Sequence, residues 1–66
     1  MKSYNVECKN KKGTLSIREN EIQRIAYADF GTYAETYSFS RYYSDEDILQ
    51  DLYDYHGIIS EFIKKT

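Results

Sequence analysis

The sequence predicts an α+β fold, a small antiparallel β-meander of three to four strands packed against one C-terminal amphipathic helix. Three observations predict it. Apolar and polar residues alternate with a period of two in several segments before Ser44. After Ser44, apolar residues recur at three- and four-residue steps, as on one face of a helix. The chain has 66 residues, so we expect a single domain over 1–66 with a small core.

The first two strands are expected to form a hairpin. Residues 3–9 alternate, and their apolar members share one face: Tyr4, Val6 and Cys8. The segment Asn10-Lys11-Lys12-Gly13 follows, and asparagine and glycine can supply the positive φ angles of a tight turn. Residues 14–18 then return as a second strand that buries Leu15 and Ile17.

The next segment, 22–30, has two interpretations. Ile25 and Tyr27 favour one face, whereas the other face would hold Ala26, Ala28 and Phe30. The segment is then a strand with a bulge or one buried on both faces, and a short helix over 20–29 is the competing interpretation. A turn at Phe30-Gly31-Thr32 leads into a last strand over 33–41, with Tyr37 and Phe39 pointing inward.

The C-terminal helix is expected to begin after Ser44, whose hydroxyl can accept a hydrogen bond from the amide of Asp47. Its apolar stripe comprises Ile48, Leu49, Leu52, Tyr55, His56, Ile59, Phe62 and Ile63. Lys64 and Lys65 would close the last turn, where positive charge is favoured. Gly57 is the weak point, because glycine inside a helix costs about 1 kcal/mol relative to alanine. The helix bends or ends there.

Charge divides the chain into two unlike parts. Residues 1–24 carry six basic and three acidic side chains, whereas 25–66 carry three basic and eight acidic ones. Five of those acids lie between Asp45 and Asp54, and Asp47, Asp51 and Asp54 share a solvent-facing edge of the expected helix. The sequence therefore predicts one acidic pole.

No segment carries a catalytic, metal or cofactor motif. The only histidine, His56, could pair with Cys8 as a nucleophile, but both residues are better explained as members of apolar faces. A structural zinc site needs about four cysteine or histidine ligands, and the acids 45–47 lack the spacing of a calcium loop. The three glycines stand apart, so there is no phosphate-binding loop. We expect no enzyme activity and no cofactor.

Location and origin follow from composition. With one cysteine the chain can form no internal disulfide, and it opens with no secretory leader pattern. Its apolar stretches are far shorter than the roughly 20 residues of a membrane span. We therefore expect a cytoplasmic protein. Tyrosine is abundant, with 8 residues, and proline and tryptophan are absent. Such usage is typical of AT-rich genomes, including those of low-GC bacteria and their phages.

The leading hypothesis is a small regulator or inhibitor that binds another protein. Tyrosines are enriched at interfaces, and adjacent Tyr42 and Tyr43 cannot both enter the core from one short element. A row of carboxylates beside them could dock on a basic surface, such as that of a nucleic-acid enzyme, by imitating phosphates. The predicted partner-binding residues are Tyr42, Tyr43, Asp45, Glu46, Asp47, Asp51, Tyr53 and Asp54.

Two other classes stay open. The chain could bind nucleic acid itself, through tyrosines of the sheet and a set of basic side chains. The stacking tyrosine would be Tyr4, Tyr27 or Tyr37, and the basic residues Lys9, Lys11, Lys12, Arg18 and Arg24. The isoelectric point of about 5.2 argues against direct nucleic-acid binding. The third class is a structural subunit, and a homodimer is compatible with a domain this small.

Overall fold

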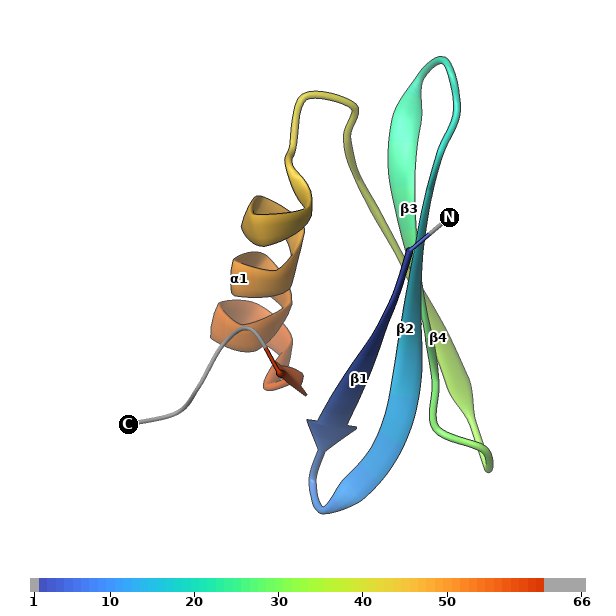
Figure 1. Ribbon diagram of the computed structural model, residues 1–66, viewed down its shortest axis with the longest axis vertical. Coiled ribbons are helices and arrows are strands. Elements are labelled where there is room, and N and C mark those ends of the chain that lie inside the picture. The colour runs from blue at the N-terminus through green and yellow to red at the C-terminus, as the bar shows by residue number, and fades with distance from the viewer. Residues whose placement is uncertain (1, 62–66) are drawn as a thin grey trace.

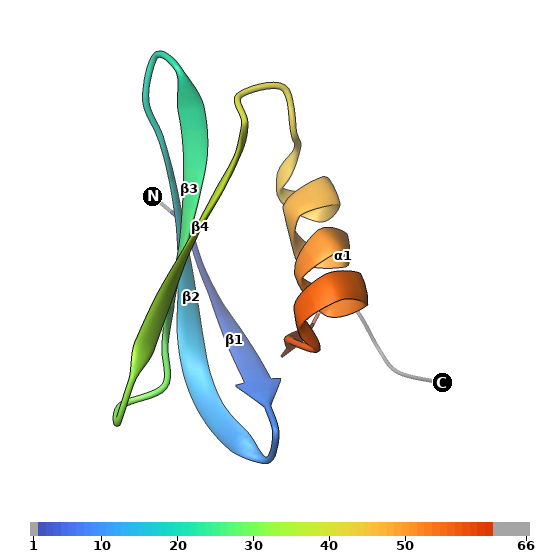
Figure 2. The ribbon, with the colours of Figure 1, turned by 180° about the vertical axis from the view of Figure 1, so that it is seen from behind.

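A computed structural model describes residues 2–61 and confirms the small α+β meander. In chain order the elements are β1 (Lys2–Cys8), β2 (Lys11–Glu19), β3 (Gln23–Asp29), β4 (Ala34–Ser40), α1 (Asp45–His56) and β5 (Ile59–Ser60). The strands form one antiparallel sheet in the order β4-β3-β2-β1-β5. Helix α1 lies across one face of this twisted sheet, and the opposite face has no covering element among the described residues (Figure 1, Figure 2).

The first hairpin turns earlier than predicted. Lys9 and Asn10 both have positive φ, 52° and 68°, so they form the two-residue turn, and β2 already begins at Lys11. Two consecutive residues with positive φ match the right-handed twist of the flanking strands. Gly13 is therefore not a turn residue but lies within β2, opposite Val6.

Segment 22–30 forms strand β3, and both the helix and the bulge are wrong. The pairing of β3 runs without interruption, over Arg24–Asp29 with β2 and over Gln23–Asp29 with β4. Ala26 and Ala28 are completely buried, whereas Tyr27 is exposed on the outer face of the sheet. The inward positions can be small because larger side chains lie directly opposite on β2, where Ile17 faces Ala26 and Leu15 faces Ala28.

Helix α1 begins as predicted and ends at the glycine. The hydroxyl of Ser44 accepts from the Asp47 amide at 3.1 Å, and the Asp47 carboxylate accepts from the Ser44 amide at 3.2 Å. Gly57 adopts a left-handed conformation with φ 68°, and its amide donates to carbonyls of the last turn. The predicted stripe is thus wrong from the last turn onward: Tyr55 and His56 are exposed, and Ile59 belongs to β5. Phe62, Ile63, Lys64 and Lys65 lie outside the described residues.

The core lies between α1 and the inner face of the sheet. Ile48, Leu49 and Leu52 come from the helix and are almost fully buried. The remaining members, which come from the strands and the segments that follow them, are Tyr4, Val6, Cys8, Leu15, Ile17, Ala26, Ala28, Phe30 and Ile58. Tyr37 and Phe39 of β4 pack against this cluster at its margin and are only partly buried, as the sequence predicted for inward-pointing residues of the last strand.

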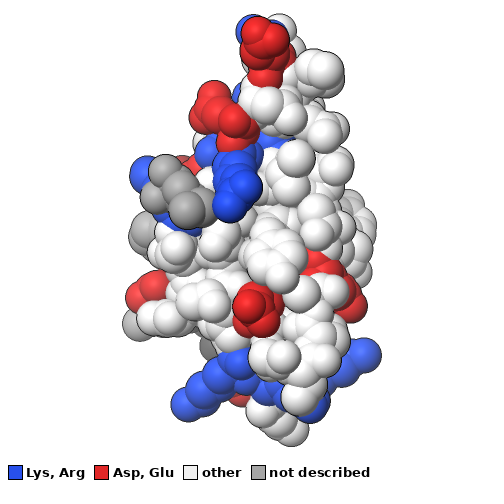
Figure 3. All heavy atoms as spheres, turned by 90° about the vertical axis from the view of Figure 1, so that its right-hand side faces the viewer, with Lys and Arg blue, Asp and Glu red and all other residues white. Residues whose placement is uncertain are grey.

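The outer face of the sheet is largely uncharged. Figure 3 looks onto this face, where neutral side chains occupy the middle and Lys and Arg side chains gather at the lower end, the end of the β1–β2 hairpin. Alternation places hydroxyl residues there, among them Thr14, Ser16, Thr36 and Ser38, together with Tyr27.

Candidate protein-binding surface

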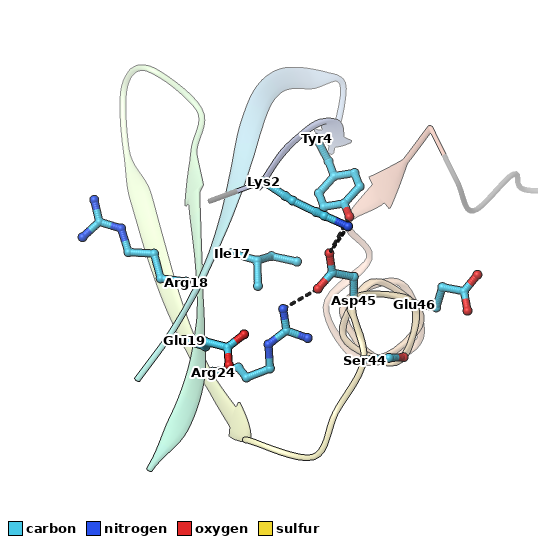
Figure 4. Close-up of a pocket in the computed structure, with 9 residues that line it drawn as sticks. All are labelled: Lys2, Tyr4, Ile17, Arg18, Glu19, Arg24, Ser44, Asp45 and Glu46. Atoms are coloured by element: carbon cyan, nitrogen blue, oxygen red, sulfur yellow. Dashed lines mark hydrogen bonds and ion pairs between the residues drawn. The ribbon is translucent and has the colours of Figure 1, made fainter. Parts of the chain in front are cut away.

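Asp45 does not belong to the exposed acidic edge, which corrects one of the predicted site residues. Its carboxylate points from the first turn of α1 toward the sheet, where it accepts hydrogen bonds from Tyr4 at 2.7 Å and from Arg24, and forms an ion pair with Lys2 at 3.7 Å (Figure 4). Arg24 also donates to the carbonyl oxygen of Tyr43 at 2.7 Å. The cluster therefore fastens the start of the helix to β1 and β3.

The protonation of this cluster follows from its surroundings. Burial by itself would raise the pKa of Asp45, but the hydrogen bonds from Tyr4 and Arg24 and the charges of Arg24 and Lys2 outweigh it and hold that pKa below its usual value. For Tyr4, burial and the hydrogen bond to the Asp45 carboxylate raise the pKa to about 12. Asp45 is therefore ionised and Tyr4 is neutral at physiological pH.

An open hollow of about 970 Å³ surrounds this cluster. Lys2, Arg24 and Asp45 meet in it, while Arg18 points to the other side of the sheet (Figure 4). Lys2 and Arg24 both pair with the single Asp45 carboxylate, and Glu19 and Glu46 line the same hollow. We interpret the cluster as structural.

Four carboxylates of α1 are fully or partly exposed to solvent. Asp47, Asp51 and Asp54 follow one another at four- and three-residue spacing, and we call these three the acidic strip. Glu46 is exposed on the neighbouring face of the helix. Within residues 2–61 both ion pairs involve Asp45, so none of these four carboxylates has a salt-bridge partner there. The helix thus presents negative charge that the described part of the chain does not neutralise.

The predicted tyrosines separate in the structure. Tyr42 is 83% exposed, stacks under Arg41 with 5.3 Å from the guanidinium carbon to the ring centroid, and lines a hollow with Glu19 and Glu21. Tyr43 is 40% exposed and instead contacts the ring of Phe39, at 5.6 Å between centroids. The structure therefore brings Tyr43, but not Tyr42, toward the acidic strip.

A second hollow, of about 500 Å³, lies between β4 and α1. Asp51 of the strip lines it together with Tyr43, Tyr37, Phe39 and His56. Tyr53, another predicted site residue, is only partly exposed. Tyr55 was missed because the apolar stripe placed it in the core, yet its side chain is 79% exposed. Its position four residues after Asp51 was the available signal, since such residues are neighbours on a helix surface.

Cys8 and His56 do come close, but not as a catalytic pair. The buried Cys8 thiol donates to the backbone carbonyl of His56 at 3.8 Å, and the His56 imidazole packs against the ring of Tyr37 in a tilted arrangement, with 4.5 Å between centroids. No group of three or more metal-ligating side chains occurs within residues 2–61. The single helix in that range is neither long nor apolar enough to cross a membrane.

The three candidate tyrosines of the nucleic-acid hypothesis lie in different places, and only Tyr27 is exposed beside one of the named basic residues, Arg18. Tyr4 is buried in the core, Tyr27 lies on the outer face of the sheet, and Tyr37 lies on the inner face. The guanidinium of Arg24 is already engaged by Asp45 and by the carbonyl of Tyr43. The hairpin lysines are exposed, but the structure places no stacking platform of the three tyrosines beside them.

No protein-family model matches the chain, and no curated protein or solved structure does so either.

Proposed function

We propose that this protein is a non-enzymatic binding module, a small regulator or inhibitor, whose partner is a protein with a basic surface. The observation that carries the proposal is the acidic strip, three carboxylates on one helix edge without a cationic partner in the described chain. Exposed Tyr55 and half-exposed Tyr43 stand beside the strip and supply apolar area. The contact surface is therefore the strip with these two tyrosines.

The strip would act mainly on encounter and orientation. Complementary charge steers a partner toward the correct patch and raises the association rate, while each exposed ion pair adds only about 0.2–1 kcal/mol. Measured along the helix axis from the carboxylate at position i, the one at i+4 lies about 6 Å away and the one at i+7 about 10 Å away. A row of negative groups at these spacings suits a surface that otherwise holds nucleic-acid phosphates, so a nucleic-acid enzyme is the class of partner that we favour.

The test is capture of partners by the tagged protein from lysate of its native host, at low and at high salt. We compare the wild type with Asp51→Lys/Asp54→Lys, which reverses two strip charges and spares Asp47 because that residue caps the helix. A protein captured by the wild type at low salt should be lost at high salt and in this variant.

The matched control is Glu7→Lys/Glu21→Lys, which changes the net charge equally at two sites remote from the strip. It should retain the partner. Equal capture by both double variants would show that the strip is not the site, and recovery of nucleic acid alone would favour the nucleic-acid-binding hypothesis instead.

A further inference from the structure

Strand β4 forms an open edge of the sheet, where another strand could pair. It is seven residues long, pairs with β3 on one side, and has no strand on its other side within residues 2–61. The opposite edge of the sheet is partly closed, because β5 pairs with Val6 and Glu7 of β1. Soluble proteins commonly protect such an edge with proline, lysine or a bulge. The β4 sequence, Ala-Glu-Thr-Tyr-Ser-Phe-Ser, contains neither residue, and its register with β3 is regular. Its one charge, on the inward-pointing Glu35, accepts a hydrogen bond from the Tyr37 hydroxyl of the same strand.

The pairing with β3 determines which backbone groups of β4 point outward. The amide of Phe30 donates to the carbonyl of Tyr33 at 2.9 Å, which makes these two residues a hydrogen-bonded pair. In an antiparallel ladder such pairs alternate, so Glu35, Tyr37 and Phe39 exchange bonds with β3. The amides and carbonyls of the intervening residues then face the open edge, and these are Ala34, Thr36, Ser38 and Ser40. The Ser40 carbonyl agrees with this assignment, since it accepts from the Tyr43 amide at 3.0 Å.

The inward side chains at this edge are incompletely packed. Tyr37 and Phe39 reach the margin of the core but are only partly buried, and with Tyr43 they line the 500 Å³ hollow between β4 and α1. On the outer face, Thr36 and Ser38 are small and exposed. A strand laid against this edge would need small residues on its outer side and apolar ones on its inner side. Strand β4 itself has both.

We propose that β4 pairs antiparallel with β4 of a second copy of this chain, about a two-fold axis at Tyr37. Thr36 of each copy then lies opposite Ser38 of the other, and their outward amides and carbonyls bond across the axis. On the inner face the two Tyr37 rings meet, and Glu35 lies opposite Phe39 of the second copy. The inward side chains of each β4 strand then lie at the margin of the hollow between β4 and α1 of the other copy.

Charge disfavours one of the alternative registers. Glu35 is the only charged residue of β4, and centring the axis on Glu35 would oppose two carboxylates directly. Centring it on Phe39 would leave half of the strand unpaired. Registers centred on Thr36 or Ser38 would also pair the outward groups, and the charge-swap variants below separate them from the register centred on Tyr37. This interface goes beyond the proposed function, because no residue of the acidic strip takes part in the strand pairing, although Asp51 lines the hollow that the inward side chains approach.

The first test is the mass of the full chain by sedimentation equilibrium from micromolar to millimolar concentration. We expect a monomer–dimer equilibrium that high salt does not weaken, because main-chain hydrogen bonds join two chains that each carry a net charge of −2. Amide hydrogen exchange at Thr36 and Ser38 should slow as concentration rises. A monomeric mass throughout would overturn the proposal.

Variants test the register itself. Ser38→Pro removes an outward amide without removing a bond to β3, and should weaken the dimer by roughly thirtyfold, because one hydrogen bond per copy is lost. Thr36→Lys/Ser38→Lys sets like charges opposite each other and should give a monomer. In Thr36→Lys/Ser38→Glu each introduced lysine faces an introduced glutamate, so the dimer should return.

The control, Ser3→Lys/Thr14→Lys, adds the same charge to exposed positions remote from β4 and should remain dimeric. A dimer that persists in both Ser38→Pro and Thr36→Lys/Ser38→Lys would place the interface elsewhere and overturn the proposal. Failure of the strip proposal would appear instead as unchanged partner capture by Asp51→Lys/Asp54→Lys, whatever the mass of that variant.

Discussion

At the scale of single residues, the contact between Arg24 and Asp45 joins the two layers of the molecule. Arg24 comes from the inner face of β3, and its guanidinium donates to the Asp45 carboxylate and to the Tyr43 carbonyl. Both charged side chains are largely buried, at 14% and 16% exposure. Removing one partner from such a pair leaves the other charge buried without compensation, and this costs more than the pair itself contributes.

We expect Asp45→Asn to lower the free energy of unfolding by about 1–3 kcal/mol at neutral pH, as for loss of a buried charged hydrogen-bond acceptor. Because the folded-state pKa of Asp45 is lowered, its stabilising effect is present above the unfolded-state value of about 3.9 and is lost as pH falls through the folded-state pKa. Urea denaturation should therefore show the two proteins converging in strong acid. Equal stability at pH 7 would contradict this account.

Gly13 is required by close approach rather than by a turn. A Cβ atom added there would collide with the carbonyl oxygen of Asp29 and lie 2.8 Å from a ring carbon of Phe30. We expect Gly13→Ala to reduce stability by about 1–3 kcal/mol, as for other overpacked sites. Thr14→Ala, at the exposed next residue, should change stability by less than about 0.5 kcal/mol. A Gly13→Ala variant as stable as the wild type in urea would refute the steric explanation.

At the scale of elements, the helix is limited at both ends by local chemistry. Ser44 and Asp47 cap its start reciprocally, and Gly57 ends it in a left-handed conformation. The amide of Ile58 then donates to the carbonyl of Leu52 at 3.1 Å, which turns the chain back so that Ile58 enters the core and β5 reaches β1. One glycine thus decides that the C-terminal residues complete the sheet instead of extending the helix.

We therefore expect Gly57→Ala to lower the free energy of unfolding by about 1 kcal/mol, because alanine is strained at positive φ. Gly57→Asn should lose less, since asparagine tolerates this conformation better. Thermal or urea unfolding of the two variants measures the difference. If alanine were the better tolerated residue, the left-handed cap would not be what ends the helix.

At the scale of the whole molecule, the charged side chains include one basic group and one acidic group, and charges of both signs are interspersed elsewhere (Figure 3). Basic side chains gather at the end of the β1–β2 hairpin (Figure 3), whereas α1 presents the acidic strip and Glu46. A chain with a net charge of only −2 therefore offers a partner one distinctly acidic region. Such grouping affects encounter rates and partner choice more than it affects the stability of the fold.

If the protein acts by binding alone, chemistry at Cys8 and His56 is dispensable. We expect Cys8→Ala/His56→Ala to capture the same salt-sensitive partner as the wild type, since the thiol is bonded to a backbone carbonyl and not to the imidazole. A modest loss of stability should accompany it, because the Cys8 side chain is buried. Loss of the biological effect with partner capture retained would instead indicate a chemical role for this pair.

Patterns of local origin were predictable from the sequence, and those that depend on distant neighbours were not. The alternation in β1 and β4, the burial of Leu15 and Ile17 and the cap at Ser44 depend on side-chain period and local hydrogen bonds, so the sequence predicted each of them. The exposed carboxylates of the acidic strip also followed from helical spacing. Asp45 did not, because its orientation depends on Arg24, 21 residues earlier in the chain.

The sequence by itself thus determined the meander, the helix and the sign of the surface that the helix presents, because each follows from period, capping and charge over a few residues. Tertiary structure decided the rest. Segment 23–29 is a strand because it lies between β2 and β4, and Gly13 is required because Phe30 and Asp29 lie so close to it. The tertiary structure also separates Tyr42 from Tyr43 and leaves β4 as an open edge. Each of these depends on which segments become neighbours in space, and the short-range pattern of one chain carries no record of that.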